Sequence, residues 1–177
     1  QSGVSHPVTA VLLNYRGYDT LLEIAVLLLA VLAILATSGV PSSMPRRLAH
    51  PVVHTLARLM APLAVIVSIY LLWAGAFRPG GAFQAGAVLA AAMVLLHLVG
   101  LLRGWEAPHL WLRLGLVVGF LIFLAVAAGL ATQGALLAYP PDWAGRLILL
   151  IESGLTLSLA LILAGLFLFL VGPEVET

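Results

Sequence analysis

The sequence predicts an all-α, polytopic membrane protein of about five transmembrane helices, with a proline- and glycine-rich break between the second and third. Its composition leads to this fold class, because 63% of the 177 residues are hydrophobic and 8% are charged. The mean hydropathy of +1.16 excludes a soluble globular domain. The charged residues also leave five uncharged stretches, each close to the ~20 residues that span ~30 Å of hydrocarbon.

The uncharged stretches place the helices at 21–38, 57–76, 83–102, 112–132 and 147–171. Residues 8–19 begin apolar and turn polar, and they are too few to cross a membrane. We expect them to form a re-entrant or interfacial lead-in to the first helix. Thr20 and Glu23 have the spacing of a capping box, and Asp19 adds a favourable negative charge, so the first helix is predicted to start there.

A polar connector follows the first helix. Residues 37–51 hold three prolines, three serines and two arginines, which is typical of a boundary between modules. We therefore predict a segment 1–41 with one transmembrane helix and a four-helix membrane domain over 42–177. The loops after the first and third helices carry five arginines against three on the other side. By the positive-inside rule, this predicts an outside amino terminus and a cytoplasmic carboxyl terminus.

Several kinds of chemistry are excluded by composition. The chain has no cysteine, so disulfides, iron–sulfur clusters and thiolate zinc sites are excluded. It also has no basic run of the kind that binds nucleic acid. His50 and His54 have a metal-compatible spacing but no third ligand nearby, which favours an interfacial pair at a helix entrance. We expect no catalytic residue, no metal and no cofactor.

The fourth predicted helix carries small residues on one face. Gly115 and Gly119 stand four apart, and Ala125 and Gly129 continue the pattern further along the helix. Small residues at this spacing let two helix backbones approach closely. This face is therefore predicted to pack against another helix, either in this chain or in a neighbour.

Glu152 is the one acid inside the last predicted helix. An ionised carboxylate in hydrocarbon costs several kcal/mol unless it is paired or hydrated, so such acids generally face a bundle interior, a water path or a partner. One interpretation is a proton or cation relay. The other is an interfacial acid that Arg146 neutralises or that reaches out to water.

His97 lies in the third predicted helix, near its Arg103 end. An imidazole with an ordinary pKa near ~6.5 can shuttle protons or simply hydrogen-bond a neighbouring carbonyl. A third, less favoured interpretation is haem ligation together with His54, since both fall toward the same side of the membrane.

The segment from Gly75 to Gly86, GAFRPGGAFQAG, interrupts two apolar stretches. It is too rich in glycine and proline to continue a helix. It is compatible with a tight hairpin turn in which Pro79 stops one helix. Alternatively, with Arg78 beside exposed amides, the break lines a cavity or seats a partner helix.

This break and the helix before it resemble the signature of the MnhB/MrpB family, a family of membrane subunits of Mrp-type sodium/proton antiporters. The matching residues of the break are Gly75, Pro79, Gly80, Gly81, Phe83 and Gly86. Ala76 stands where the family has a histidine, and Ala82 stands for the third glycine of the run. No role of that histidine carries over to this chain.

The amino-terminal segment carries a second resemblance. Residues 8–34 look like the carboxy-terminal module of the large MrpA-type antiporter subunit, a module also found as the E-type subunit of membrane-bound hydrogenases. The specific part is the run RGYDTLLE, which begins with Arg16 and Gly17. The order of the two resemblances matches subunits that are fused in such operons.

Together the resemblances imply a non-catalytic, multi-pass subunit of the cell's inner (cytoplasmic) membrane, in a multisubunit Mrp-type Na+/H+ antiporter module. It would contribute to the ion pathway, dock neighbouring antiporter-like subunits and contact the lipid bilayer. Glu152 and Glu23 are the first candidates for the pathway, followed by Asp19 and His97. The alternative is a structural membrane subunit of a complex I-like hydrogenase or another redox-driven ion pump. A stand-alone transporter would show an internal repeat, and the five unequal segments show none.

Overall fold

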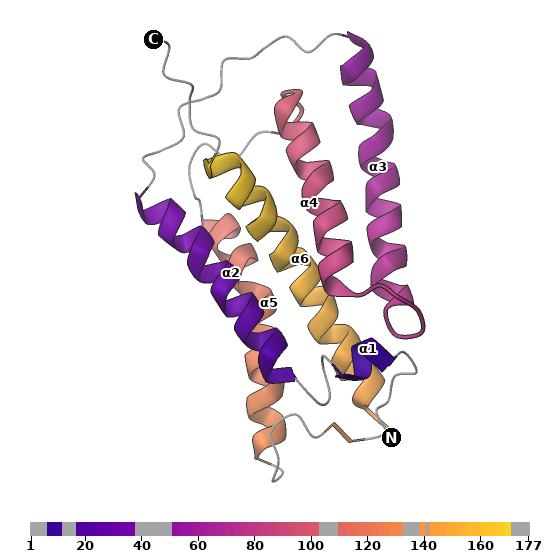
Figure 1. Ribbon diagram of the computed structural model, residues 1–177, viewed down its shortest axis with the longest axis vertical. Coiled ribbons are helices and arrows are strands. Elements are labelled where there is room, and N and C mark those ends of the chain that lie inside the picture. The colour runs from indigo at the N-terminus through magenta and orange to yellow at the C-terminus, as the bar shows by residue number, and fades with distance from the viewer. Residues whose placement is uncertain are drawn as a thin grey trace.

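The computed structural model describes residues 7–11, 17–37, 51–102, 110–132, 139–140 and 142–170, and within these ranges all regular structure is helical. A short first helix precedes five long ones (Figure 1). In chain order the helices are α1 (Pro7–Ala10), α2 (Gly17–Thr37), α3 (Pro51–Ala74), α4 (Ala82–Leu98), α5 (Leu110–Ala131) and α6 (Ala144–Leu170).

The five long helices confirm the predicted all-α membrane fold. Four of them, α2, α3, α5 and α6, are long and apolar enough to cross a membrane. The remaining helix, α4, has 17 residues and extends about 25 Å. Successive long helices alternate in direction, so that α2, α4 and α6 run one way and α3 and α5 the other (Figure 1). The chain is a multi-pass membrane protein.

The predicted start of the first long helix is wrong. Helix α2 begins at Gly17, so Thr20 is its fourth residue and lies buried, 4% exposed, instead of capping the end. Gly17 and Tyr18 form the start of the helix. Both residues can adopt helical backbone angles, although glycine is a poor helix former. Asp19 does lie in the first turn, where a negative charge favours the helix dipole.

Helix α6 is the centre of the bundle. It packs against α4 and α5 most extensively, and against α2 and α3 as well. Of the most apolar 18-residue window of α6, 61% is buried, whereas the corresponding share in α2, α3 and α5 lies between 17% and 28%. Helices α2, α3 and α5 therefore expose most of their own surface, and α3 packs mainly against α4.

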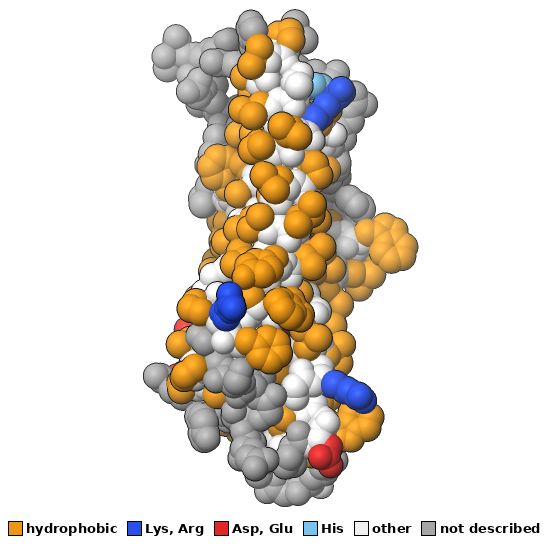
Figure 2. Space-filling view, turned by 90° about the vertical axis from the view of Figure 1, so that its right-hand side faces the viewer, with side chains coloured by type: hydrophobic (Ala, Val, Ile, Leu, Met, Phe, Trp, Pro, Cys, Tyr) orange, Lys and Arg blue, Asp and Glu red, His pale blue; other side chains and the backbone are white. Residues whose placement is uncertain are grey.

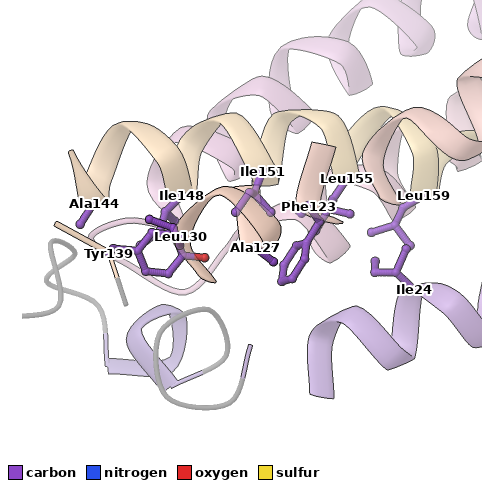
Figure 3. Packing of buried hydrophobic residues seen from close by; sticks show 11 residues of the cluster. Ile24, Phe123, Ala127, Leu130, Tyr139, Ala144, Ile148, Ile151, Leu155 and Leu159 are labelled. Carbon is purple, nitrogen blue, oxygen red and sulfur yellow. The ribbon is translucent and has the colours of Figure 1, made fainter. Parts of the chain in front are cut away.

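Two clusters of buried apolar side chains lie along α6. The first joins the amino-terminal half of α6 to α2 and α5, and Figure 3 shows Ile24 of α2 beside Leu159 of α6. The second joins the carboxy-terminal half of α6 to the ends of α2 and α4 and the start of α5, with Val31 and Ile162 at its centre. Because the clusters stack along one axis, each helix keeps a defined depth relative to α6.

The prediction that the small-residue face of α5 packs against another helix is confirmed for Gly115 and Gly119, whose partner is α6, whereas Ala125 and Gly129 are exposed. A methyl group on Gly119 would lie 2.6 Å from the carbonyl oxygen of Gly154, so the two backbones touch at this point. One turn away, the hydroxyl of Ser158 donates a hydrogen bond to the carbonyl oxygen of Leu116. Close backbone approach and interhelical hydrogen bonds are the interactions that usually stabilise contacts between helices in lipid.

Candidate functional site

The break between α3 and α4 folds into a compact turn that spans Gly75 to Gly81. The carbonyl oxygen of Leu71 accepts two hydrogen bonds, from the N–H of Gly75 at 3.1 Å and from the N–H of Gly81 at 2.9 Å. The last turn of α3 thus captures the chain just before α4 begins. This geometry supports the hairpin interpretation of the break.

Glycine is required at both ends of this turn. A methyl group on Gly75 would lie 2.7 Å from the Cα of Gly81, and one on Gly80 would lie 2.5 Å from the carbonyl oxygen of Leu71. Gly81 itself has a φ of 107°, a conformation that side chains rarely permit. These glycines therefore allow the chain to reverse between α3 and α4 within the segment from Gly75 to Gly81.

Glu152 of α6 lies directly beneath this turn. Its side chain is 6% exposed, and its carboxylate accepts a hydrogen bond from the N–H of Ala82, the first residue of α4. The fit is tight, because a methyl group on Gly81 would lie 2.9 Å from Oε1 of Glu152. Gly81 has no side chain to cap α4, so α6 supplies the cap from outside the helix.

This position suits a negative charge. The amino terminus of a helix carries the positive end of the helix dipole and unpaired N–H groups. The carboxylate of Glu152 therefore gains a local partner within the protein and does not reach out to water. Arg146, the other partner considered above, lies over the ring of Trp143, with 5.4 Å between its guanidinium carbon and the ring centroid.

A carboxylate has room for about four hydrogen bonds. The bond from Ala82 therefore leaves acceptor positions for a proton, a water molecule or a cation. Within the described residues, no cluster of three or more histidine or acidic side chains is arranged to hold a metal ion.

The other candidate residues lie at different places on the bundle. Glu23 is exposed on the outer face of α2, and Asp19 is partly buried in the first turn of the same helix. Arg16 falls outside the described residues. His97 lies in the last turn of α4, with its Nδ1 atom buried and without a hydrogen-bond partner among the described residues.

The structure separates both Glu23 and His97 from Glu152. Ile24, the neighbour of Glu23, lies beside Leu159 of α6, which is about 10 Å further along that helix than Glu152. His97 stands at the opposite end of α4 from Ala82, 15 residues further along and therefore about 22 Å away. Glu152 and His97 are not in contact range of one another, so they do not form a direct proton-transfer pair.

The contact that Ser68 makes was not predicted from the sequence. Its hydroxyl, 3% exposed, donates a 2.8 Å hydrogen bond to the carbonyl oxygen of Ala85 and ties α3 to α4 behind the turn. The available signal was a serine hydroxyl within the apolar part of α3, since such groups bond to neighbouring helices in lipid.

Tyr139 was also missed as a buried residue. It is 8% exposed and belongs to the first apolar cluster. Burial raises the pKa of its phenol to about 12, because the charged phenolate is poorly solvated there.

Comparison with known proteins gives one family match. The model of the domain related to the MnhB subunit of Na+/H+ antiporters matches residues 52–175. An uncharacterized protein of Methanocaldococcus jannaschii is 32% identical in an alignment 108 residues long, which covers 50% of this chain and 41% of that protein. The chain therefore spans less than half the length of this relative.

Two solved membrane complexes contain chains with the same fold. A chain of the membrane-bound sulfane sulfur reductase, an archaeal respiratory membrane complex, matches with a TM-score of 0.81 and 23% identity, over 98% of this chain and 81% of that chain. A chain of the Mrp complex from Dietzia sp. matches with a TM-score of 0.73 and 24% identity, over 100% of this chain and 22% of that chain.

Proposed function

Because the chain belongs to the family of domains related to the MnhB subunit of Na+/H+ antiporters, we propose that it is a membrane subunit of a multisubunit Mrp-type cation/proton antiporter module. In this role it contributes to the ion pathway and docks neighbouring antiporter-like subunits. It performs no catalysis itself and resides in the cytoplasmic membrane, with its amino terminus outside. The likeness to a chain of a solved Mrp complex supports this assignment.

The observation that carries the pathway role is the buried carboxylate of Glu152 at the glycine turn. The charge lies against the family's own signature segment and contacts backbone there. Intramembrane acids are costly and generally mark ion or proton paths. The spare acceptor positions of Glu152 would take up the moving proton or cation, and Asp19 and Glu23 of α2 would extend the path toward a neighbouring subunit.

A second function is favoured by one specific observation. The match to the sulfane sulfur reductase covers 81% of the matched chain, whereas the match to the Mrp complex covers 22%. A subunit of nearly this size therefore occurs in a respiratory complex. In the second proposal the chain is a structural membrane subunit of a redox-driven ion pump, and Glu152 serves as a cap and nothing else.

Three variants of the assembled complex separate these roles, measured as Na+/H+ exchange in everted membrane vesicles. Glu152→Gln removes the charge but keeps an oxygen that can accept the Ala82 hydrogen bond. Glu152→Ala removes both. Ser153→Ala is the matched control at the same depth, because Ser153 is exposed and bonds to the carbonyl oxygen of Leu149 in its own helix.

The antiporter proposal expects Glu152→Gln to assemble normally and to lose at least about tenfold in exchange rate, while Ser153→Ala stays at the wild-type rate. If Glu152→Gln exchanges at the wild-type rate and Glu152→Ala fails to assemble, Glu152 is a cap and the structural proposal stands. Absence of Na+/H+ exchange in the intact wild-type complex would overturn the antiporter assignment itself.

A further inference from the structure

Glu23 lies on the outer face of α2 with no partner in the described part of this chain. Its side chain is exposed, and no hydrogen bond or ion pair joins it to another described residue. The apolar residues around it, Leu22 and Val26, are each 62% exposed. The face defined by Leu22, Glu23, Val26 and Leu29, called the Glu23 face below, is therefore apolar except for one carboxylate.

The Glu23 face cannot turn inward. The opposite side of α2 is buried through Thr20, Ile24, Leu28 and Val31. Ile24 and Val31 are fully enclosed and belong to the two apolar clusters along α6. A rotation that brought Glu23 into the bundle would expose these side chains, so the outward position of the carboxylate is fixed by packing.

The length of α2 places Glu23 inside the hydrocarbon. Its 21 residues extend about 31 Å, which just matches a hydrocarbon thickness of ~30 Å. If Glu23 stood at the water boundary, the apolar part from Ile24 to Ala36 would extend only about 20 Å and would not span the membrane. Glu23 lies about 9 Å along the helix from its first residue, and therefore about that far inside the boundary of the hydrocarbon.

Helix α3 provides the contrasting surface. Figure 2 shows that hydrophobic side chains cover the face of the molecule that α3 forms. Between Leu59 and Phe77 the sequence of this helix and its end carries no charged residue. Leu63, Ile66 and Ile69 are at least half exposed there. This face can meet lipid without cost, whereas the Glu23 face cannot.

We propose that the Glu23 face is the contact surface for a transmembrane helix of another subunit, and that this helix places a lysine or arginine against Glu23. The carboxylate of Glu23 indicates a partner helix with a basic residue, because an acid in hydrocarbon is stabilised by pairing with an opposite charge. The exposed Leu22, Val26 and Leu29 then pack against the apolar residues of the same helix. The inference rests on the proposed function only in that the chain works within a multisubunit membrane complex.

The absence of native cysteine makes a direct test possible on the assembled complex. A photoactivatable cross-linker is attached through Val26→Cys on the Glu23 face, and through Ile66→Cys on α3 as the matched lipid-facing control. Val26 and Ile66 are similarly exposed, 62% and 64%. Val26 is expected to cross-link to one transmembrane helix of a co-purified subunit, with a lysine or arginine within one turn of the cross-linked residue, and Ile66 to lipid.

Charge variants complete the test. Glu23→Gln should lower the share of the chain that co-purifies with the cross-linked subunit by about tenfold, and Glu23→Asp should retain most of it. Exchanging the two charges, Glu23→Lys together with an acid at the partner's basic position, should restore the association that Glu23→Lys alone abolishes. The chain's own fold is monitored by the thermal midpoint of the isolated subunit in detergent, which these variants should not change.

Three results would overturn the proposal: cross-links from Val26 to lipid alone, cross-links to a helix without a basic residue near the contact, or undiminished association of Glu23→Gln. None of these depends on ion transport. A complex that passes the cross-linking test but lacks Na+/H+ exchange would reject the antiporter function and leave the docking surface intact.

Discussion

Gly75 and Gly81 touch across the turn between α3 and α4, so closely that a single methyl group on Gly75 would lie 2.7 Å from the Cα of Gly81. The contact closes a turn in which both N–H groups bond to the carbonyl oxygen of Leu71. The N–H of Ala82 comes directly after the turn, and the carboxylate of Glu152 accepts a hydrogen bond from it. The path of the backbone and the position of the buried charge are thus determined together.

Replacement of Gly75 by alanine is expected to destabilise the protein by about 2 kcal/mol or more, because the obstructing atoms are backbone and cannot turn aside. The thermal midpoint of the purified protein in detergent measures the loss. Gly129→Ala in α5 is the control, since a methyl group there meets nothing within 4 Å and alanine favours the helix. Equal midpoints for the two variants would show that the turn opens at little cost.

Removal of the α4 cap is expected to have graded effects. Glu152→Ala deprives the N–H of Ala82 of its partner in a buried place, which costs about 1–2 kcal/mol. Glu152→Gln keeps an acceptor and should lose less than half of that. The rate of amide hydrogen exchange at Ala82 reports on this bond directly. Equal exchange rates in wild type and Glu152→Ala would mean that the carboxylate does not hold the helix end.

Loss of the Ser68 hydroxyl is expected to cost about 1 kcal/mol, the typical net value of one hydrogen bond. Ser68→Ala removes the contact to Ala85 in the neighbouring helix, whereas Ser153→Ala removes a bond within one helix, at an exposed position. Thermal midpoints should therefore fall for Ser68→Ala and stay near wild type for Ser153→Ala. The opposite order would remove Ser68 from the contacts that hold α3 to α4.

The protein is expected to lose stability at high pH because the phenol of Tyr139 is buried. The pKa of its phenol rises from 10.0 to about 12 in the folded protein, so between these values the unfolded chain loses a proton that the folded chain retains. Stability contributed by the neutral phenol is full below about pH 10 and declines as the pH rises toward 12. Tyr139→Phe should flatten this decline, as followed by thermal midpoints in a pH series.

At neutral pH the same variant keeps the ring in the apolar cluster. The hydroxyl of Tyr139 is buried and has no hydrogen-bond partner among the described residues, so its removal should leave stability unchanged or raise it by about 1 kcal/mol. A clear loss of stability at pH 7 would mean that the hydroxyl has a partner in the folded protein.

The helices were predictable from sequence because long uncharged stretches have few alternatives in a membrane. The positions of charged residues bounded the five helices, and the structure places most of their ends within four residues of the expected ranges, whereas α3 begins six residues earlier than predicted, at Pro51. The start of α2 was predicted four residues late, at residue 21 in place of Gly17, because a local motif, Thr20 with Glu23, matched a capping box by spacing alone. The boundary between residues 41 and 42 stays a prediction.

The site was only partly predictable. Glu152 and the glycines of the turn stood out individually, since an acid and a helix break are both unusual in apolar sequence. Their contact was not predictable, because it joins the start of α4 to a residue of α6 far along the chain. The small residues Gly86, Gly119 and Gly154 set how closely these helices approach, and no spacing rule within one helix reports that distance.

The burial of α6 bears on how the protein is made. Its amino-acid sequence follows those of α2, α3, α4 and α5, yet its side chains fill the centre that these helices share. Helices α2, α3, α4 and α5 therefore enter the membrane before the helix that covers their inner surfaces has been made. The bundle is completed when α6 is inserted. The cost of placing the carboxylate of Glu152 in the membrane is then reduced, because the amino terminus of α4 is already present to donate a hydrogen bond to it.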